Sequence, residues 1–192
     1  MMNSGGAVSE GARAAAAAEA EAALAEAEAR TGRRPDPEPI ELDENEQELL
    51  AMELESVGTV PSAERRAAYD ALADAVEDGT VSAELVPLLE RLIAVSLESG
   101  RARRRYLAEG EKILTDLFKR TPAGKELLGV IKGVNKALEV LDGRTVSGVK
   151  VGLRTLGHMR ISLETEDLKL TLAVRPSAVA VESMSVLGGK KG

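Results

Sequence analysis

The chain has 192 residues, of which 44% are hydrophobic, but it contains no Trp, no Cys, one Phe and two Tyr. Its core must therefore be built from Leu, Val, Ile and Ala, and disulfides and thiolate metal sites are excluded. No apolar run reaches the about 18 to 20 residues that a membrane-spanning helix needs. The first residues lack the basic and apolar stretches of a secretory signal, so we expect a cytoplasmic protein.

Charge is unevenly distributed along the chain. Residues 1–99 carry 7 Lys and Arg against 22 Asp and Glu, whereas residues 100–192 carry 18 against 10. The net charge of −7 thus combines an acidic first half with a basic second half. This division is typical of an acidic tail, of a basic surface for an acidic partner, or of one half that screens the other.

The composition of residues 1–39 indicates an arm outside the hydrophobic core. Residues 8–30 are mostly Ala and Glu with one large apolar residue, Leu24, so their helix propensity is high but they have no face to bury. Three prolines follow between residues 33 and 39 and exclude a continuous helix. We expect a mobile or fraying acidic arm with a Pro-rich linker here, and a short basic tail over residues 188–192.

A single α+β domain is predicted over residues 40–187, and its first part is helical. Helices are expected over about 44–56, from Ser62 to Asp78-Gly79, over 82–99, over 101–120, and from Thr121 to Asp142-Gly143. The expected apolar stripe of the helix over 101–120 comprises Tyr106, Leu107, Gly110, Ile113, Leu114, Leu117 and Phe118. That of the last helix comprises Leu127, Leu128, Ile131, Val134, Leu138 and Leu141.

Beyond Gly143 the apolar residues recur with period two, which indicates strands at about 146–187. The predicted fold is therefore an N-terminal layer of four to five helices followed by a three- to four-stranded antiparallel meander. The register of the last strand stays open. Val179 and Val181 are odd-numbered, whereas Met184 and Val186 are even-numbered, so a regular strand would place these two pairs on opposite faces.

Motifs for catalysis or metal binding are incomplete. Gly124-Lys125 lacks the glycines and the Ser or Thr of a phosphate-binding loop, and the pair Ser147 and Lys150 lacks the companion motifs of serine acyl-transfer enzymes. His158 is the only histidine, and the acidic run 43–46 lacks the Gly and Glu of a calcium loop. We therefore expect a protein that is not an enzyme and holds no cofactor or metal.

Four arginines stand at the predicted start of the helix over 101–120, where the helix dipole disfavours each exposed cation by about 0.3–1 kcal/mol. One explanation is that a helix continues from Ser82 through Gly100 and places the arginines in its middle. The other is an anionic partner: phosphate, nucleic acid or the chain's own Glu-rich segment.

Two other surfaces are candidates for contacts. If the sheet buries the face of Val149, Ile161 and Leu170, its other face is basic and includes His158 and Arg175. Small residues at Gly129 and Gly133 would let a second backbone approach closely, either within the chain or from another subunit. The candidate residues for an anion or a protein partner are Arg101, Arg103, Arg104, Arg105, Lys125, Lys132, Lys136, Lys150, Arg154, Arg160 and Lys169.

These features favour a non-catalytic assembly, adaptor or regulatory protein that acts through protein–protein contacts and self-associates. One alternative is a protein that binds nucleic-acid backbone phosphates through Arg101–Arg105 and the basic sheet face. The predicted sheet has no aromatic residue on which bases could stack, so that binding would be weakly sequence-specific. A second alternative is a small-ligand carrier or an enzyme whose site has no recognised motif.

Overall fold

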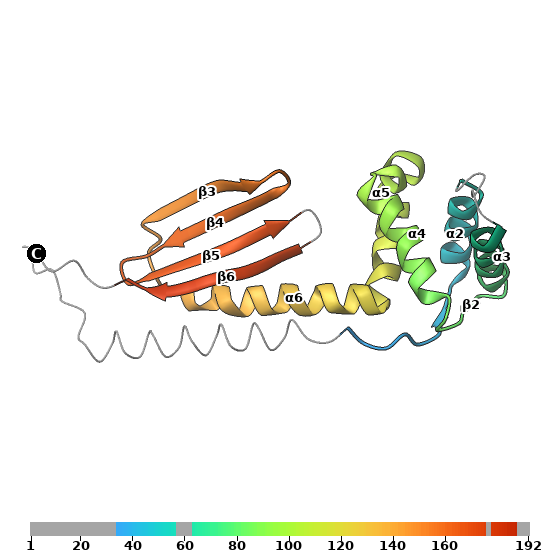
Figure 1. The fold of residues 1–192 in the computed structure, drawn as a ribbon, viewed down its shortest axis with the longest axis horizontal. Helices are drawn as coiled ribbons and strands as arrows, with labels where there is room; N and C mark the ends of the chain where they lie inside the picture. Colours follow the sequence, from blue (N-terminus) through green and yellow to red (C-terminus); the bar gives the residue numbers. More distant parts are fainter. Residues whose placement is uncertain (1–33, 57–62, 176–177, 188–192) are drawn as a thin grey trace, which may run out of the picture. The chain divides into compact units, whose positions relative to one another are not determined.

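The computed structural model describes residues 34–56, 63–175 and 178–187 (Figure 1). Within them the predicted fold class is confirmed, since five helices precede a four-stranded antiparallel sheet. One domain was predicted over residues 40–187, whereas the chain divides into two compact units, 34–126 and 127–187 in their described parts. The predicted arm and tail lie outside the described residues, except for residues 34–39.

The first unit contains β1 (Ile40–Glu41), α2 (Glu44–Ser56), α3 (Ala63–Glu77), β2 (Thr80–Val81), α4 (Val86–Glu98) and α5 (Arg101–Arg120). The predicted helix over 44–56 is confirmed, and a capping box starts it. Asp43 Oδ1 accepts from the Glu46 N–H at 2.9 Å, and Glu46 Oε2 accepts from the Asp43 N–H at 3.0 Å. The acidic run that resembles a calcium loop is thus the start of a helix.

Leucine, isoleucine and valine side chains from α2 to α5 form the core of this unit. The largest fully buried ones are Leu50, Leu72, Leu89, Ile93, Leu114 and Leu117. A two-stranded sheet, β1 paired antiparallel with β2, joins the start of the unit to the end of α3. Strands of two residues leave no periodic pattern, so the sequence did not predict them.

Two predictions about α4 and α5 are wrong. A continuous helix through Gly100 is excluded, because α4 ends at Glu98 and Gly100 adopts a left-handed φ of 67°. Arg101 therefore begins a new helix. Leu107 was expected on the buried stripe of α5, but it has φ 61° and ψ −163°, bends the helix, and is 73% exposed.

Thr121 caps α6 (Pro122–Leu138), as predicted. Its Oγ1 accepts from the Gly124 N–H at 3.2 Å, while Glu90 of α4 accepts from the Ala123 N–H at 2.8 Å. A Cβ at Gly124 would lie 1.9 Å from the Phe118 carbonyl oxygen, so only glycine fits the close approach at this turn. Gly124-Lys125 is therefore part of the first turn of a helix.

The second unit contains the rest of α6, the 3-10 turn η1 (Glu139–Leu141), and the strands β3 (Gly148–Thr155), β4 (His158–Glu164), β5 (Leu168–Arg175) and β6 (Ala178–Val186). The strand order is β3-β4-β5-β6, and each pair is antiparallel. A β-bulge resolves the open register of β6. Leu172 pairs with Val181 but Thr171 pairs with Ser183, so Glu182 is the extra residue.

The bulge puts Val179, Val181, Met184 and Val186 of β6 on one face of the sheet. Val134, Leu138 and Leu141 pack on this face against β5, β6 and part of β4, with Leu170 and Leu172 at the centre. Leu128 and Ile131 were expected in the same stripe, but they are 43% and 41% exposed. No helix of the described residues is long and apolar enough to cross a membrane.

Candidate interaction surfaces

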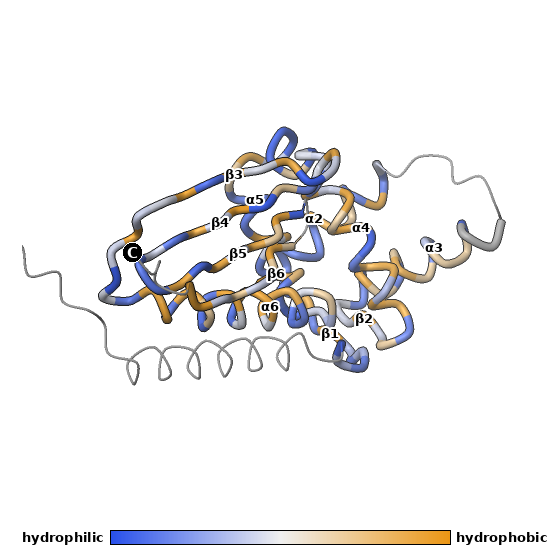
Figure 2. The backbone as a smooth tube through the Cα atoms, turned by 60° about the vertical axis from the view of Figure 1, so that its left-hand side comes forward, coloured by the Kyte–Doolittle hydropathy of each residue, from blue (hydrophilic) through white to orange (hydrophobic). Residues whose placement is uncertain are grey.

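Alternation along the strands gives the sheet one apolar and one polar face, and Figure 2 shows hydrophobic and hydrophilic residues alternating along β3 and β4. The pairing rows Val151–Ile161–Leu172–Val181 and Val149–Leu163–Leu170–Met184 lie on the apolar face. The row Lys150–Ser162–Thr171–Ser183 lies on the polar face.

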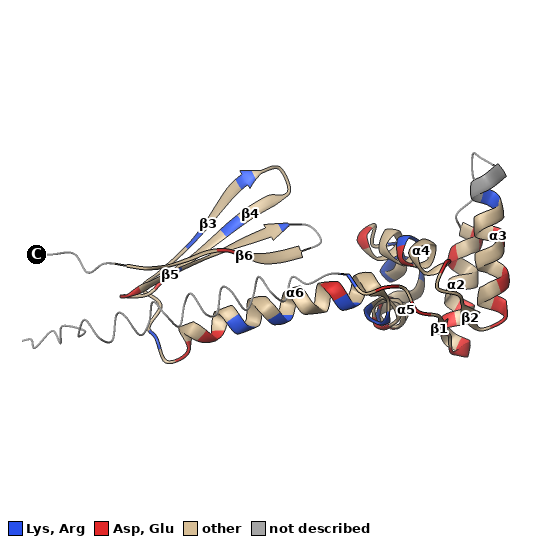
Figure 3. Cartoon of the chain, turned by 60° about the horizontal axis from the view of Figure 1, so that its bottom comes forward, with Lys and Arg blue, Asp and Glu red and all other residues tan. Residues whose placement is uncertain are grey.

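The apolar face is covered over only part of its width. Figures 1 and 3 show α6 beside β5 and β6, whereas β3 and β4 rise away from the helix. Leu168 and Leu170 of β5 are 1% and 0% exposed. β3 contributes no residue to either buried cluster of this unit's described part. The expectation that Val149 is buried with Ile161 and Leu170 is therefore wrong for Val149.

Four side chains form what we name the apolar strip: Val149 (64% exposed), Val151 (62%), Leu153 (74%) and Met159 (45%). They face the same side of two neighbouring strands, and Leu153 pairs directly with Met159. Leu156, in the turn that joins the two strands, is 97% exposed. The strip is a hydrophobic surface without a described partner in the chain.

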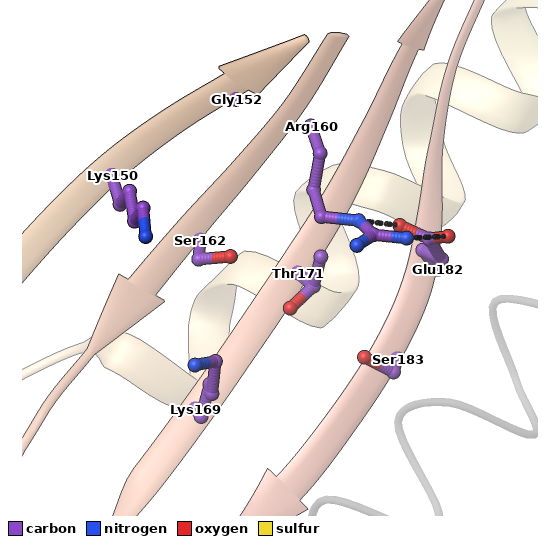
Figure 4. Close-up of a pocket in the computed structure, with 8 residues that line it drawn as sticks. All are labelled: Lys150, Gly152, Arg160, Ser162, Lys169, Thr171, Glu182 and Ser183. Atoms are coloured by element: carbon purple, nitrogen blue, oxygen red, sulfur yellow. Dashed lines mark hydrogen bonds and ion pairs between the residues drawn. The ribbon is translucent and has the colours of Figure 1, made fainter. Parts of the chain in front are cut away.

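The polar face forms an open hollow of about 550 Å³ (Figure 4). Its central row consists of the Lys150 amine and the hydroxyls of Ser162, Thr171 and Ser183, one from each strand. The Arg160–Glu182 ion pair bounds one side of the row, and Lys169 of β5 bounds the other (Figure 4). Apart from Gly152, the residues that line the hollow all carry a charged group or a hydroxyl.

Ion pairs within the sheet engage Arg154, Arg160 and Lys169 of the predicted basic face. Glu182 accepts from Arg160 at 2.5 and 2.6 Å and from Arg154 at 3.0 Å. The Arg160 hydrogen bonds lower the pKa of Glu182. Lys169 donates to Glu164 at 2.5 Å and lowers the pKa of that carboxyl.

Arg101 lies in the other unit, where it pairs with a buried carboxylate. Its Nη2 donates to Glu53 Oε2 at 2.5 Å, and the Glu53 side chain is 1% exposed. Glu53 Oε1, Arg101 Nε and the Tyr106 hydroxyl are buried, and none of these atoms has a hydrogen-bond partner among the described residues. Burial, followed by the neighbouring Glu53 carboxylate, raises the pKa of Tyr106 to about 12. Arg101 therefore contributes to the interior of this unit.

The other arginines of the cluster lie at the surface. Arg103 is 72% exposed and 3.5 Å from Glu111, and the Arg105 guanidinium lies 5.5 Å from the centre of the Tyr106 ring. Arg104 is also exposed. This cluster and the sheet belong to different units of the chain.

The predicted residues of α6 are divided between the two units as well. Lys125 lies 3.6 Å from Glu38 in the first unit, whereas Lys132 is exposed and Lys136 pairs with Glu139 in the second. Gly133 is buried and Gly129 is half-buried.

Sequence reasoning missed four acidic residues that organise these units. Glu46, Glu53 and Glu90 are buried, and each pairs with an arginine far away in the sequence, Arg120, Arg101 and Arg34 respectively. Glu182 of β6 forms ion pairs with Arg154 of β3 and Arg160 of β4 on the polar face. The only available signal was a glutamate among leucines, as at Glu53 and Glu90. The described residues contain no group of three or more acidic or His side chains that could hold a metal ion.

Comparison of the chain with protein-family models, curated proteins and solved structures finds no match. The case for a function therefore depends on the geometry of these surfaces.

Proposed function

We propose that this chain is a non-catalytic assembly or adaptor protein that self-associates through the apolar strip. The observation that supports this is the exposure of Val149, Val151, Leu153 and Met159. Soluble monomers rarely expose a contiguous apolar patch of more than a few hundred Å², and larger patches mark sites of interaction. A cytoplasmic location remains part of the proposal, since the chain has no cysteine.

The strip is large enough to contribute to association. Complete burial of a Val, Leu or Met side chain contributes about 1.5–3 kcal/mol, so these partly exposed side chains would contribute roughly 4–7 kcal/mol per copy. Two copies together would offset an association cost of about 4–15 kcal/mol. We therefore expect a dimer that depends on each residue of the strip.

Val151→Glu tests this proposal. We expect the wild-type protein to have a mass above the 20.2 kDa of one chain in size-exclusion light scattering, and Val151→Glu to have the mass of one chain. A carboxylate in an apolar contact loses its hydration without gaining a partner. Val151 is exposed, so the variant should fold, which circular dichroism would check.

Ser185→Glu is the matched control. Ser185 is exposed on the polar face of β6, where the same change of charge should leave the mass unaltered. If Val151→Glu keeps the wild-type mass, the strip is not the contact and the proposal is wrong.

Binding of nucleic-acid phosphates is the weaker candidate. Arg154, Arg160 and Lys169 are paired with Glu182 and Glu164, so binding a phosphate would require these ion pairs to break. Lys150 has no such ion pair among the described residues, but a single lysine gives little affinity for a phosphate backbone.

A further inference from the structure

We propose that the apolar strip packs face to face against the same strip of a second copy of this chain. This inference rests on the proposed function and identifies its partner. Three features of the sheet support it: the chemistry of the strip, the thickness of the layer that covers its neighbours, and the direction of its side chains.

The chemistry of the strip favours an identical partner. All apolar-face residues of β3 and β4 are uncharged: Val149, Val151, Leu153, Met159, Ile161 and Leu163. The cations Lys150, Arg154 and Arg160 are on the other face, so two copies in contact would not bring their like charges together. A charged partner would find no opposite charge on this face. The apolar strip of a second copy is an uncharged, apolar surface and therefore fits.

The thickness of the covering layer also fits a second copy. A helix is about 10–12 Å across with its side chains, and two sheets pack about 10 Å apart. α6 covers β5 and β6 and leaves β3 uncovered (Figure 3). The β3 and β4 strands of a second copy can therefore lie beside α6, in the same layer. A two-fold axis then gives both copies the same contact.

The direction of the side chains disfavours a simpler arrangement, in which two β3 edges pair to extend the sheet. Pairing of edges would satisfy backbone groups of β3, but the side chains stand perpendicular to the sheet and would remain in water. Only a layer above the sheet removes Val149, Val151 and Leu153 from solvent.

Complementary charges at one position test whether the two strips meet. Val151→Glu and Val151→Lys should each have the mass of one chain, because like charges then face each other in an apolar contact. Their equimolar mixture should regain the wild-type mass, because each dimer then contains one charge of each sign. Loss of folding cannot produce this result, since neither variant alone regains the mass.

The outcomes separate the inference from the proposed function. If the mixture stays monomeric while the wild-type protein is dimeric, the strips do not meet and only the inference is wrong. If the wild-type protein is itself monomeric, the proposed function is wrong as well.

A cysteine at the same position distinguishes the two arrangements. The chain has no native cysteine, so Val151→Cys introduces a single thiol. If the β3 edges of two copies paired antiparallel over seven residues, the register in which Val151 faces Val151 of the other copy would place Lys150 opposite Gly152. The registers centred on Lys150 or on Gly152 would instead place two cations opposite each other, which disfavours them. The register centred on Val151 puts the two Cα atoms about 4.5–5.5 Å apart, within the range of a disulfide.

Sheets packed face to face are about 10 Å apart, beyond the reach of a disulfide. We therefore expect oxidised Val151→Cys to keep the dimer mass in light scattering and to run as a single chain on a non-reducing gel. A disulfide-linked dimer that forms quantitatively would overturn the face-to-face arrangement.

Discussion

The Glu53 carboxylate is fully buried in the first unit, and Arg101 is the cation that pairs with it. Removing one partner of a buried ion pair leaves an uncompensated charge, which costs more than the pair contributes. Because Arg101 is 28% exposed and water can reach part of the site, we expect Arg101→Ala to lower the free energy of unfolding by about 2–4 kcal/mol. Urea unfolding followed by circular dichroism measures this.

Arg103→Ala is the control for this prediction. Its pair with Glu111 is exposed and long, at 3.5 Å, so its removal should change the free energy of unfolding by less than about 0.5 kcal/mol. Equal losses in the two variants would mean that the Glu53 site does not have the energetic role that its burial indicates.

Residues whose partners lie close in the sequence could be predicted, and those with distant partners could not. Thr121 could be predicted as a helix cap because the N–H group that donates to its hydroxyl belongs to Gly124, only three residues later. Glu53 meets Arg101 across 48 residues, and no local pattern encodes that contact. The sequence could place four arginines at the start of a helix, but it could not show that Arg101 alone points inward.

At the scale of elements, the bend in α5 is a second feature that the sequence did not indicate. Leu107 has φ 61° and ψ −163°, a region that is essentially restricted to glycine and costs other residues on the order of 1–3 kcal/mol. Its side chain is 73% exposed, so little packing is lost on truncation. We expect Leu107→Gly to raise the free energy of unfolding by about 1 kcal/mol, measured in urea.

Ala108→Gly is the matched control for the bend, since Ala108 is the next residue, is exposed, and has helical geometry. There glycine relieves no strain and should cost about 1 kcal/mol. If Leu107→Gly destabilises the protein as much as Ala108→Gly does, the backbone at Leu107 is not strained.

The strands were predicted because period two is a strong signal over seven to nine residues. The register of β6 was not, because the bulge at Glu182 inserts one residue and reverses the alternation after it. Alternation also identified the apolar face of β3 correctly. It could not show that α6 leaves this face open, because a pattern indicates which side chains avoid water but not which element covers them.

At the scale of the whole molecule, the change from acidic to basic sequence at residue 100 does not coincide with the boundary between the two units, because α5 with its arginines belongs to the first unit. Figure 3 shows many acidic residues on α2 and α3 and basic residues on the strands. In the sheet, many of these bases are paired with the few acids present, so the basic half is less of an anion-binding surface than its composition indicates. Pairing of this kind makes stability depend on pH.

The polar face gives a pH dependence of defined direction. Hydrogen bonds from Arg160 to Glu182 and from Lys169 to Glu164 lower the pKa of each carboxyl in the folded chain. For Asp167, burial raises the pKa, but hydrogen bonds from Thr165 and Arg144 outweigh it and lower the pKa overall. A lowered folded pKa stabilises the fold above the unfolded pKa, about 4 for Asp and Glu, and this stabilisation is lost as the pH falls through the folded value.

Glu182→Gln isolates one of these carboxyls. At pH 7 the urea midpoint of the variant should lie below that of the wild-type protein. The neutral Gln side chain cannot form the ion pairs that the Glu182 carboxylate forms with Arg160 and Arg154. As the pH falls below about 4 the two midpoints should approach each other, and they should meet below the lowered pKa of folded Glu182, where the wild-type carboxyl is protonated and its charge is lost. A difference of equal size at pH 7 and pH 3 would show that the side chain acts through its shape at the bulge and not through its charge.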